Sequence, residues 1–266
     1  MLLVSLFGVV SGLAPPAAER IGGVAVRRVQ PEAGLPWIYE ADWESQQRFR
    51  AASMQGEDLL ATHDPLASCY WPASRVLARA LVQDHSGLDG MHVVEIGCGT
   101  GLCSLASASA GAVAVTATDV DPISLKLTAA AAAAQGFASV ETLAFDVTST
   151  SPLPPGDALI LSDLFVTAEL ASAHASRVAE ALMRGLCVFV VDPGRTSRQA
   201  FLDELARCGV SHRGFERLCD FGSIGDALHP VDVTHTDGIT HTAAMRPLGR
   251  LALLDTDEGA PVSFEI

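Results

Sequence analysis

The segment from Val93 to Gly101, with the sequence VVEIGCGTG, constrains the fold more than any other part of the chain. An apolar run leads directly into Gly97, Gly99 and Gly101, and a run of small residues follows. Glycine lets the backbone turn tightly and approach a ligand without a Cβ in the way. A helix that begins there points its first amides at that ligand. The segment therefore predicts a strand, a ligand-binding loop and a helix, in that order.

Strand-like and helix-like runs alternate around this loop. Continuous apolar runs such as CVFVV are typical of strands that are buried on both faces of a parallel sheet. The chain is therefore expected to form an α/β fold, a Rossmann-like sheet with helices on both faces. The predicted strands are 92–96, 114–118, 140–144, 158–161 and 186–191, and the predicted helices are 44–54, 72–83, 102–110, 122–135, 168–184 and 197–208.

The two ends of the chain are less regular. Residues 210–218 predict another strand, 219–238 a long loop, and 240–246 a strand that ends the sheet as a hairpin. Residues 1–30 are apolar at first and then rich in arginine, which predicts either a plastid or mitochondrial targeting segment or the disordered tail of a cytoplasmic protein. The expected division is therefore residues 1–30 as that segment, 31–85 as a helical and aromatic cap, 86–250 as the α/β domain and 251–266 as a tail.

Composition excludes several classes of partner. Hydrophobic residues make up 49% of the 266 residues, enough for a sizeable core, and the net charge of −14 argues against nucleic acid, which requires clustered Lys and Arg. No apolar stretch reaches the roughly 20 residues of a membrane-spanning helix. Six scattered cysteines without a CxxC pair predict reduced thiols. We expect a monomer that binds neither nucleic acid nor membranes.

The spacing within the glycine loop points to one cofactor. A dinucleotide-binding loop has the pattern GxGxxG, whereas the sixth position counted from Gly97 is Leu102, so that the pattern here is GxGxG. This pattern favours S-adenosylmethionine, which has no pyrophosphate to hold. Asp119 follows the next strand, 22 residues after Gly97, where a carboxylate can accept both ribose hydroxyls. Asp121, just before Pro122, is expected instead to cap a helix.

Two further aspartates follow predicted strands. Asp146 could accept the adenine amino group, or it could only stabilise a turn. Asp163 follows Ser162 at the end of the fourth strand, and reacting groups gather at the carboxyl ends of strands in such sheets. It is the candidate catalytic residue, able to orient an amine or take its proton. The DPGR turn by itself predicts that Arg195 is a solvated side chain.

No metal site is expected. His229, His235 and His241 are six residues apart, a spacing that matches no compact set of metal ligands. They lie in or beside the late loop, which we interpret as a lid over the substrate. Without a GxSxG elbow, a hydrolase has little support.

Together, the segment Val93–Gly101, Asp119, Asp146 and Asp163 resemble the successive motifs of the seven-stranded S-adenosylmethionine-dependent methyltransferases. SDLF at 162–165, DPGR at 192–195 and YWPASRVLARAL at 70–81 resemble the protein-lysine methyltransferase subgroup of the electron transfer flavoprotein β-subunit lysine methyltransferase. The resemblance covers roughly residues 70–247. It implies the strand order 3-2-1-4-5-7-6 with strand 7 antiparallel.

The same resemblance implies roles for individual residues. Trp71 would pack against the cofactor, Glu95 would lie near its methionine amino group, and Ser162, Gly97, Gly99 and Gly101 would belong to the cofactor site. The subgroup has Asp-x-x-Tyr after the fourth strand, whereas the fourth position here is Val166. Three functions follow, in this order: methylation of a lysine on a protein substrate, methylation of a small amine, and a non-catalytic module that binds the cofactor or a partner.

Overall fold

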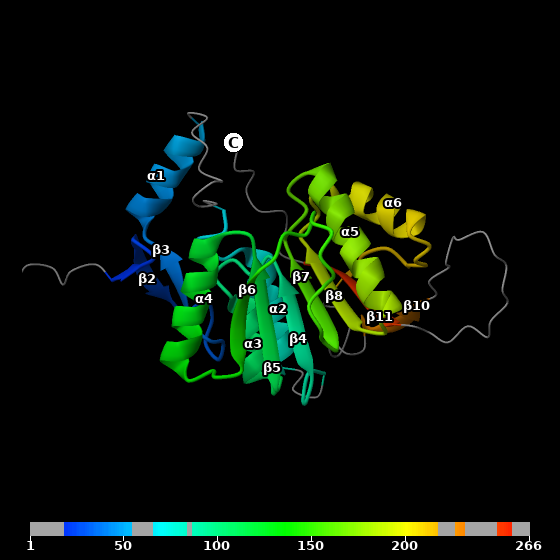
Figure 1. Ribbon diagram of the computed structural model, residues 1–266, viewed down its shortest axis with the longest axis horizontal. Helices are drawn as coiled ribbons and strands as arrows, with labels where there is room; N and C mark the ends of the chain where they lie inside the picture. The colour runs from blue at the N-terminus through cyan, green and yellow to red at the C-terminus, as the bar shows by residue number, and fades with distance from the viewer. Residues whose placement is uncertain (1–18, 55–65, 84–86, 218–226, 232–248, 257–266) are drawn as a thin grey trace, which may run out of the picture.

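The computed structural model describes residues 19–54, 66–83, 87–217, 227–231 and 249–256. Their centre is a mostly parallel sheet with the strand order β10-β11-β8-β7-β4-β5-β6, in which the short β9 also pairs with β11 (Figure 1). The sheet confirms the predicted α/β, Rossmann-like fold. Its strands are β4 (His92–Ile96), β5 (Ala114–Asp119), β6 (Val140–Ala144), β7 (Ala158–Ser162), β8 (Cys187–Asp192), β9 (Glu216–Arg217), β10 (His229–Val231) and β11 (Gly249–Asp255).

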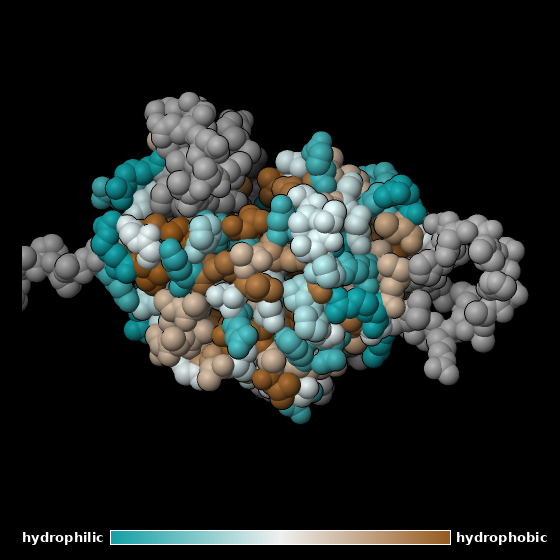
Figure 2. All heavy atoms as spheres, viewed as in Figure 1, coloured by the Kyte–Doolittle hydropathy of each residue, from teal (hydrophilic) through white to brown (hydrophobic). Residues whose placement is uncertain are grey.

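Helices cover both faces of this sheet because its central strands carry apolar side chains on both faces. On β4, Val94 and Ile96 belong to the core shared with α5 and α6, whereas Val93 belongs to the core shared with α2 and α3. Hydrophobic side chains are also visible on the face shown in Figure 2. Leu143 of the edge strand β6 is 46% exposed. The helices are α2 (Pro72–Gln83), α3 (Leu102–Ser109), α4 (Pro122–Gln135), α5 (Ala168–Met183) and α6 (Arg198–Arg207). In the described ranges, no helix has the length and apolarity needed to cross a membrane.

A second, antiparallel sheet lies before the main one in sequence and packs beside α4 (Figure 1). It consists of β1 (Arg20–Ile21), β2 (Val24–Val29) and β3 (Ile38–Ala41), and α1 (Trp43–Met54) follows it. Residues 20–29, which the prediction assigned to a targeting segment or tail, thus contain β1 and β2. Val24 and Val26 are buried in a core with Ile123 and Leu127 of α4, a contact that no local pattern reveals.

The end of the sheet also differs from the expectation. The order 3-2-1-4-5 is confirmed, and β11 lies beside β8 as the seventh strand should, but it runs parallel to β8. β10, placed in a loop by the prediction, runs antiparallel beside β11. β11 also crosses the predicted boundary at residue 250. The strand predicted at 210–218 shrinks to β9, and the one predicted at 240–246 lies outside the described residues.

Candidate cofactor and acceptor site

The three glycines of the loop after β4 all adopt left-handed backbone conformations, with φ of 63° at Gly97, 52° at Gly99 and 78° at Gly101. They also have close neighbours. A Cβ on Gly97 would come 2.5 Å from Leu164 Cδ2, and one on Gly101 would come 2.5 Å from the Thr128 side chain. Glycine is therefore required at these positions both for backbone conformation and for space. Gly101 precedes α3 and offers no side-chain cap, so the first amides of that helix have no competing side-chain acceptor there.

Asp119, at the end of β5, is bonded directly to this loop. Its Oδ2 accepts a hydrogen bond from the Gly99 amide at 2.9 Å, and its Oδ1 accepts one from the Asp121 amide at 2.9 Å. An ionised carboxylate has about four acceptor positions, and these two amides occupy two of them. The binding of ribose hydroxyls remains a prediction, and the structure adds a second role, which is holding the loop in shape. Asp121 caps α4 as expected, because its side chain accepts from the Ile123 and Ser124 amides.

Glu95 is buried beneath the loop, where the Ser104 hydroxyl of α3 donates a hydrogen bond to it. Burial raises the pKa of the Glu95 carboxyl from 4.5 to about 8, although the hydrogen bonds from Ser104 oppose the rise. The charge of Asp119 adds to the increase. Glu95 is therefore largely protonated at neutral pH, and an ammonium group brought close to it would favour the ionised form. This is the chemistry expected of a residue near the methionine end of the cofactor, which remains its predicted role.

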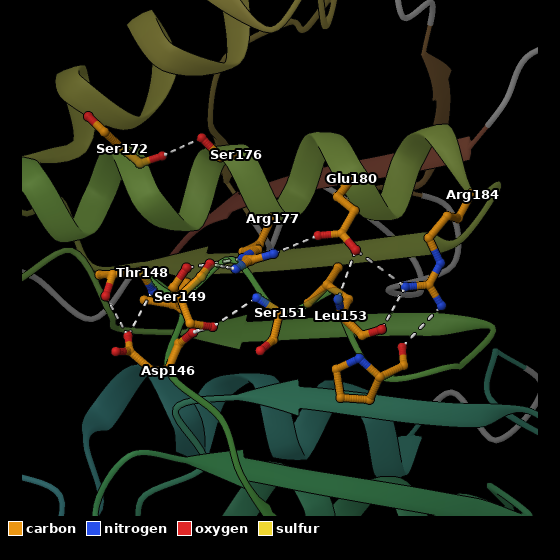
Figure 3. Close-up of polar contacts among 12 residues, drawn as sticks. Asp146, Thr148, Ser149, Ser151, Leu153, Ser172, Ser176, Arg177, Glu180 and Arg184 are labelled. Atoms are coloured by element: carbon orange, nitrogen blue, oxygen red, sulfur yellow. Dashed lines mark hydrogen bonds and ion pairs between the residues drawn. The ribbon is translucent and has the colours of Figure 1, made fainter.

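Asp146 follows β6 at the same edge as Asp119, because the Phe145 amide donates to the Asp119 carbonyl at 3.0 Å. Its own carboxylate is exposed and accepts hydrogen bonds from the Thr148 amide and hydroxyl, at 2.8 and 2.7 Å (Figure 3). These bonds hold the pKa of Asp146 below its usual value. Asp146 thus stabilises a turn, which was the alternative to binding adenine. Because its carboxylate is exposed, a bond to the adenine amino group stays a prediction.

The turn around Asp146 is attached to α5. Arg177 donates through Nε to the Val147 carbonyl at 3.0 Å and also reaches the Ser149 carbonyl (Figure 3). Further along the helix, Glu180 accepts a hydrogen bond from the Leu153 amide at 2.8 Å. A loop that would otherwise be mobile is therefore fixed against a helix on the core side of the sheet.

Asp163 is placed where a reacting group is expected, directly after β7. Its φ of 61° is the only positive value of a non-glycine residue in the described part of the chain, and its side chain is fully buried. Oδ1 pairs with Nε of Arg195, while Oδ2 is buried and accepts no hydrogen bond from any described residue. Burial raises the pKa of Asp163, and the Arg195 guanidinium opposes the rise. Arg195 is therefore an ion-pair partner of Asp163, and the interpretation of it as a solvated side chain is wrong.

The neighbouring strands contribute a cluster that the sequence did not reveal. Asp192, at the end of β8, is fully buried and pairs with Arg198 at 2.7 Å, and Arg198 also pairs with Asp255 of β11 at 3.0 Å. Register explains the cluster, because Asp255 is the partner of Asp192 in the ladder between these two parallel strands. The only local signal was an aspartate at the end of an apolar strand. With Asp163 and Arg195, the cluster holds three carboxylates and two guanidinium groups at one edge of the sheet.

Trp71 and Ser162 each contact a residue from a distant part of the sequence. The Arg195 guanidinium lies 5.3 Å from the centroid of the Trp71 ring, and the Trp71 indole donates to the Leu66 carbonyl at 3.0 Å. The hydroxyl groups of Ser162 and Ser74, at the start of α2, lie 3.3 Å apart. The predicted contacts of Trp71 and Ser162 with a cofactor stay predictions. Val166, in the place of the expected tyrosine, is 43% exposed.

The metal prediction can be compared with the structure only in part. His229 lies in β10, whereas His235 and His241 lie outside the described residues. Where the structure does describe the chain, no group of three His, Cys, Asp or Glu side chains could hold a metal ion. The five described cysteines are free thiols.

Comparison with known proteins agrees with this geometry. A family model described as a methyltransferase domain matches residues 93–187, which is the part that contains the glycine loop, Asp119, Asp146 and Asp163. A search of curated proteins returned no match. Residues 93–187 thus match a methyltransferase domain, and S-adenosylmethionine is the cofactor that this match and the GxGxG loop imply.

Similar solved structures share only part of this fold. They include the (4+2)-cyclase SpnF, with 21% identity, a TM-score of 0.45 and coverage of 65% of this chain and 74% of that one. A protein described as an RNA methyltransferase from Pyrococcus horikoshii has 16% identity, a TM-score of 0.41 and coverage of 51% and 66%. SMU.776, described as a methyltransferase complexed with SAH, has 16% identity, a TM-score of 0.44 and coverage of 55% and 43%. Similarities of this size contribute nothing to the choice of a methyl acceptor.

Proposed function

We propose that the protein transfers the methyl group of S-adenosylmethionine to a lysine amine of a protein substrate. The observation that carries the proposal is the buried Asp163 carboxylate with its unpartnered Oδ2. Asp163 is next to Leu164, whose side chain lies against Gly97 of the cofactor loop. This neighbour supports a position of the Asp163 carboxylate near the predicted methyl donor.

The residues present suit this cofactor. Three glycines keep the loop free of side chains, Asp119 is bonded to the Gly99 amide of that loop, and Glu95 can ionise next to an ammonium group. When bound, S-adenosylmethionine supplies a methyl group that is already activated by its sulfonium, so the protein has to align the acceptor and exclude water.

The acceptor side needs a proton acceptor. A lysine amine has a pKa of about 10.4 and is protonated at neutral pH, so that its lone pair is not available for attack. Asp163 can orient the ammonium group and take its proton, with the proton moving from the lysine nitrogen to a carboxylate oxygen. Arg195 would keep Asp163 ionised and in place until then, because a cation beside a buried carboxylate favours its charged form.

Cofactor binding is tested by isothermal titration with S-adenosylmethionine. We expect Asp119→Ala to weaken binding at least tenfold, because it removes both the predicted ribose acceptor and the bond to Gly99. Asp157→Ala is the matched control, since Asp157 accepts from the His92 amide at the opposite end of the same sheet. Absence of binding to the wild-type protein, or equal loss in both variants, would contradict the proposal.

The acceptor class is tested by incubating the protein and S-adenosylmethionine labelled in its methyl group with a cell lysate. Label in a discrete protein band, recovered as methyl-lysine after hydrolysis, supports the proposal. Label found only in the small-molecule fraction would indicate that the methyl acceptor is a small amine and not a protein. Tight binding without any transfer would instead indicate a non-catalytic module.

A further inference from the structure

One short segment lies between the N-terminal sheet and the cofactor loop. This segment, residues 66–71, directly precedes α2 and folds back on itself through the hydrogen bond from the Trp71 indole to the Leu66 carbonyl. Its middle lies over the loop, because a Cβ on Gly99 would come 3.3 Å from the Ala67 carbonyl oxygen. Its end reaches the acceptor side, where Trp71 faces the guanidinium of Arg195. The segment thus touches both halves of the proposed site.

The segment is held in this position from two sides. Ser124 of α4 donates through its hydroxyl to the Ala67 carbonyl at 3.2 Å. From the N-terminal sheet, the Ala41 amide of β3 donates to the Ser68 carbonyl at 2.9 Å. A further contact comes from a charged side chain, that of Glu40.

Glu40 is unusual because it is a carboxylate on a fully buried strand. It is 2% exposed, and its Oε1 accepts a hydrogen bond from the Tyr70 amide at 2.8 Å. Its Oε2 pairs at 3.0 Å with Arg27 of β2, whose side chain is 58% exposed. A buried carboxylate is costly unless its acceptor atoms are satisfied. Here Oε1 satisfies an amide 30 residues away in the sequence, and that amide is next to Trp71.

We propose that Glu40 is a positioning residue of the cofactor site, and that the N-terminal sheet is part of that site through its bond to the Tyr70 amide. The inference rests on the proposed function. The bond keeps the 66–71 segment over Gly99 and keeps Trp71 against Arg195. Without it, the segment can move away from the loop, and a bound cofactor leaves faster. Neither Glu40 nor Tyr70 has to touch the cofactor for this effect.

The test measures affinity for S-adenosylmethionine by titration, and its rate of dissociation by stopped-flow displacement, in the full-length protein. We expect Glu40→Ala to raise the dissociation rate at least tenfold. Glu40→Gln should stay within about threefold of wild type, because its carbonyl oxygen can still accept from the Tyr70 amide. Arg27→Gln is the matched control and should also stay within threefold, since it removes only the exposed partner. Hydrogen exchange of the peptide that covers residues 66–71 should be faster in Glu40→Ala alone.

The outcomes separate this inference from the proposed function. A wild-type protein that does not bind S-adenosylmethionine contradicts the proposed function. A wild-type protein that binds, together with a folded Glu40→Ala variant of unchanged dissociation rate, overturns the role of Glu40. Should Glu40→Ala fail to fold, Glu40→Leu is compared with Glu40→Gln by the same measurement. Equal rates in these two variants would overturn the role of the Tyr70 amide bond.

Discussion

At the scale of single residues, the site depends on how burial and charge act on a few carboxylates. Asp163 and Glu95 are both buried, and burial raises the pKa of each. The Arg195 guanidinium opposes the rise at Asp163, whereas the charge of Asp119 adds to the rise at Glu95, so that their surroundings act on the two pKa values in opposite directions. Such a pair of differently tuned acids is typical of functional sites.

Asp163 and Arg195 give a prediction on pH dependence. Transfer requires ionised Asp163 if this group takes the proton, so activity should fall as the pH drops through its pKa. Arg195 lowers that pKa, and Arg195→Gln should therefore shift the acid limb of the transfer rate to higher pH. The measurement is methyl transfer to the labelled acceptor as a function of pH.

Asp163→Asn is the companion variant. It should reduce transfer by at least a hundredfold, in line with the loss of a general base, while titration with S-adenosylmethionine should give an affinity within threefold of wild type. Unchanged transfer by Asp163→Asn, or an acid limb that does not move in Arg195→Gln, would refute the role of Asp163 as base.

At the scale of elements, the junction between β4 and α3 depends on glycine for two separable reasons. Gly101 before α3 and Gly136 after α4 have nearly the same backbone conformation, with φ of 78° and 77° and ψ of 17° at both. A Cβ would collide with Thr128 at Gly101, whereas nothing lies within 4 Å at Gly136. The two positions therefore form a natural comparison between backbone strain alone and strain together with steric overlap.

Gly136→Ala should lower the free energy of unfolding by roughly 1 kcal/mol, the cost of a left-handed conformation for a residue with a Cβ. Gly101→Ala should lower it by roughly 2 to 4 kcal/mol, because overpacking adds to that strain. Gly101→Ala should also weaken S-adenosylmethionine binding, and Gly136→Ala should not. Urea unfolding and titration of both variants check this, and equal destabilisation would show that Thr128 yields without cost.

At the scale of the whole molecule, two buried groups make stability depend on pH in opposite directions. Burial raises the pKa of Glu95 to about 8, so the stability that it contributes below pH 4.5 is lost as the pH rises through 8. Burial lowers the pKa of His174 from 6.5 to about 4, so the stability that it contributes above pH 6.5 is lost as the pH falls to 4. Their effects cancel between pH 4.5 and 6.5, and only that of Glu95 remains above 6.5.

We therefore expect the free energy of unfolding of the wild-type protein to fall by roughly 2 kcal/mol from pH 6.5 to pH 8, at about 1.4 kcal/mol per pH unit and proton. Glu95→Gln cannot ionise and should remove most of this dependence. Urea unfolding of both proteins at the two pH values, without cofactor, measures the difference. The same slope in both proteins would show that Glu95 is not protonated in the folded state.

The two ends of the chain show how far local patterns predict the whole molecule. The bounds of β4, β6, α2 and α4 agree with the prediction residue for residue, because periodicity and capping act within one or two turns. The strands within residues 20–29 were not predicted, because their burial requires α4, which lies about 100 residues later. The direction of β11 is set by its pairing with β8 and β10, which are separate segments, and not by any pattern within β11 itself.

The sequence by itself determined the alternation of strands and helices, the glycine loop, the capping role of Asp121 and the aspartates that follow the strands. These features are local, since each depends on a residue type and its immediate neighbours. Only the tertiary structure decided that Arg195 pairs with Asp163, that Asp192, Arg198 and Asp255 form one cluster, and that Glu40 holds the segment over Gly99. Those contacts join residues 30 or more positions apart in most cases, and their existence depends on strand order and register, which no single stretch of sequence specifies.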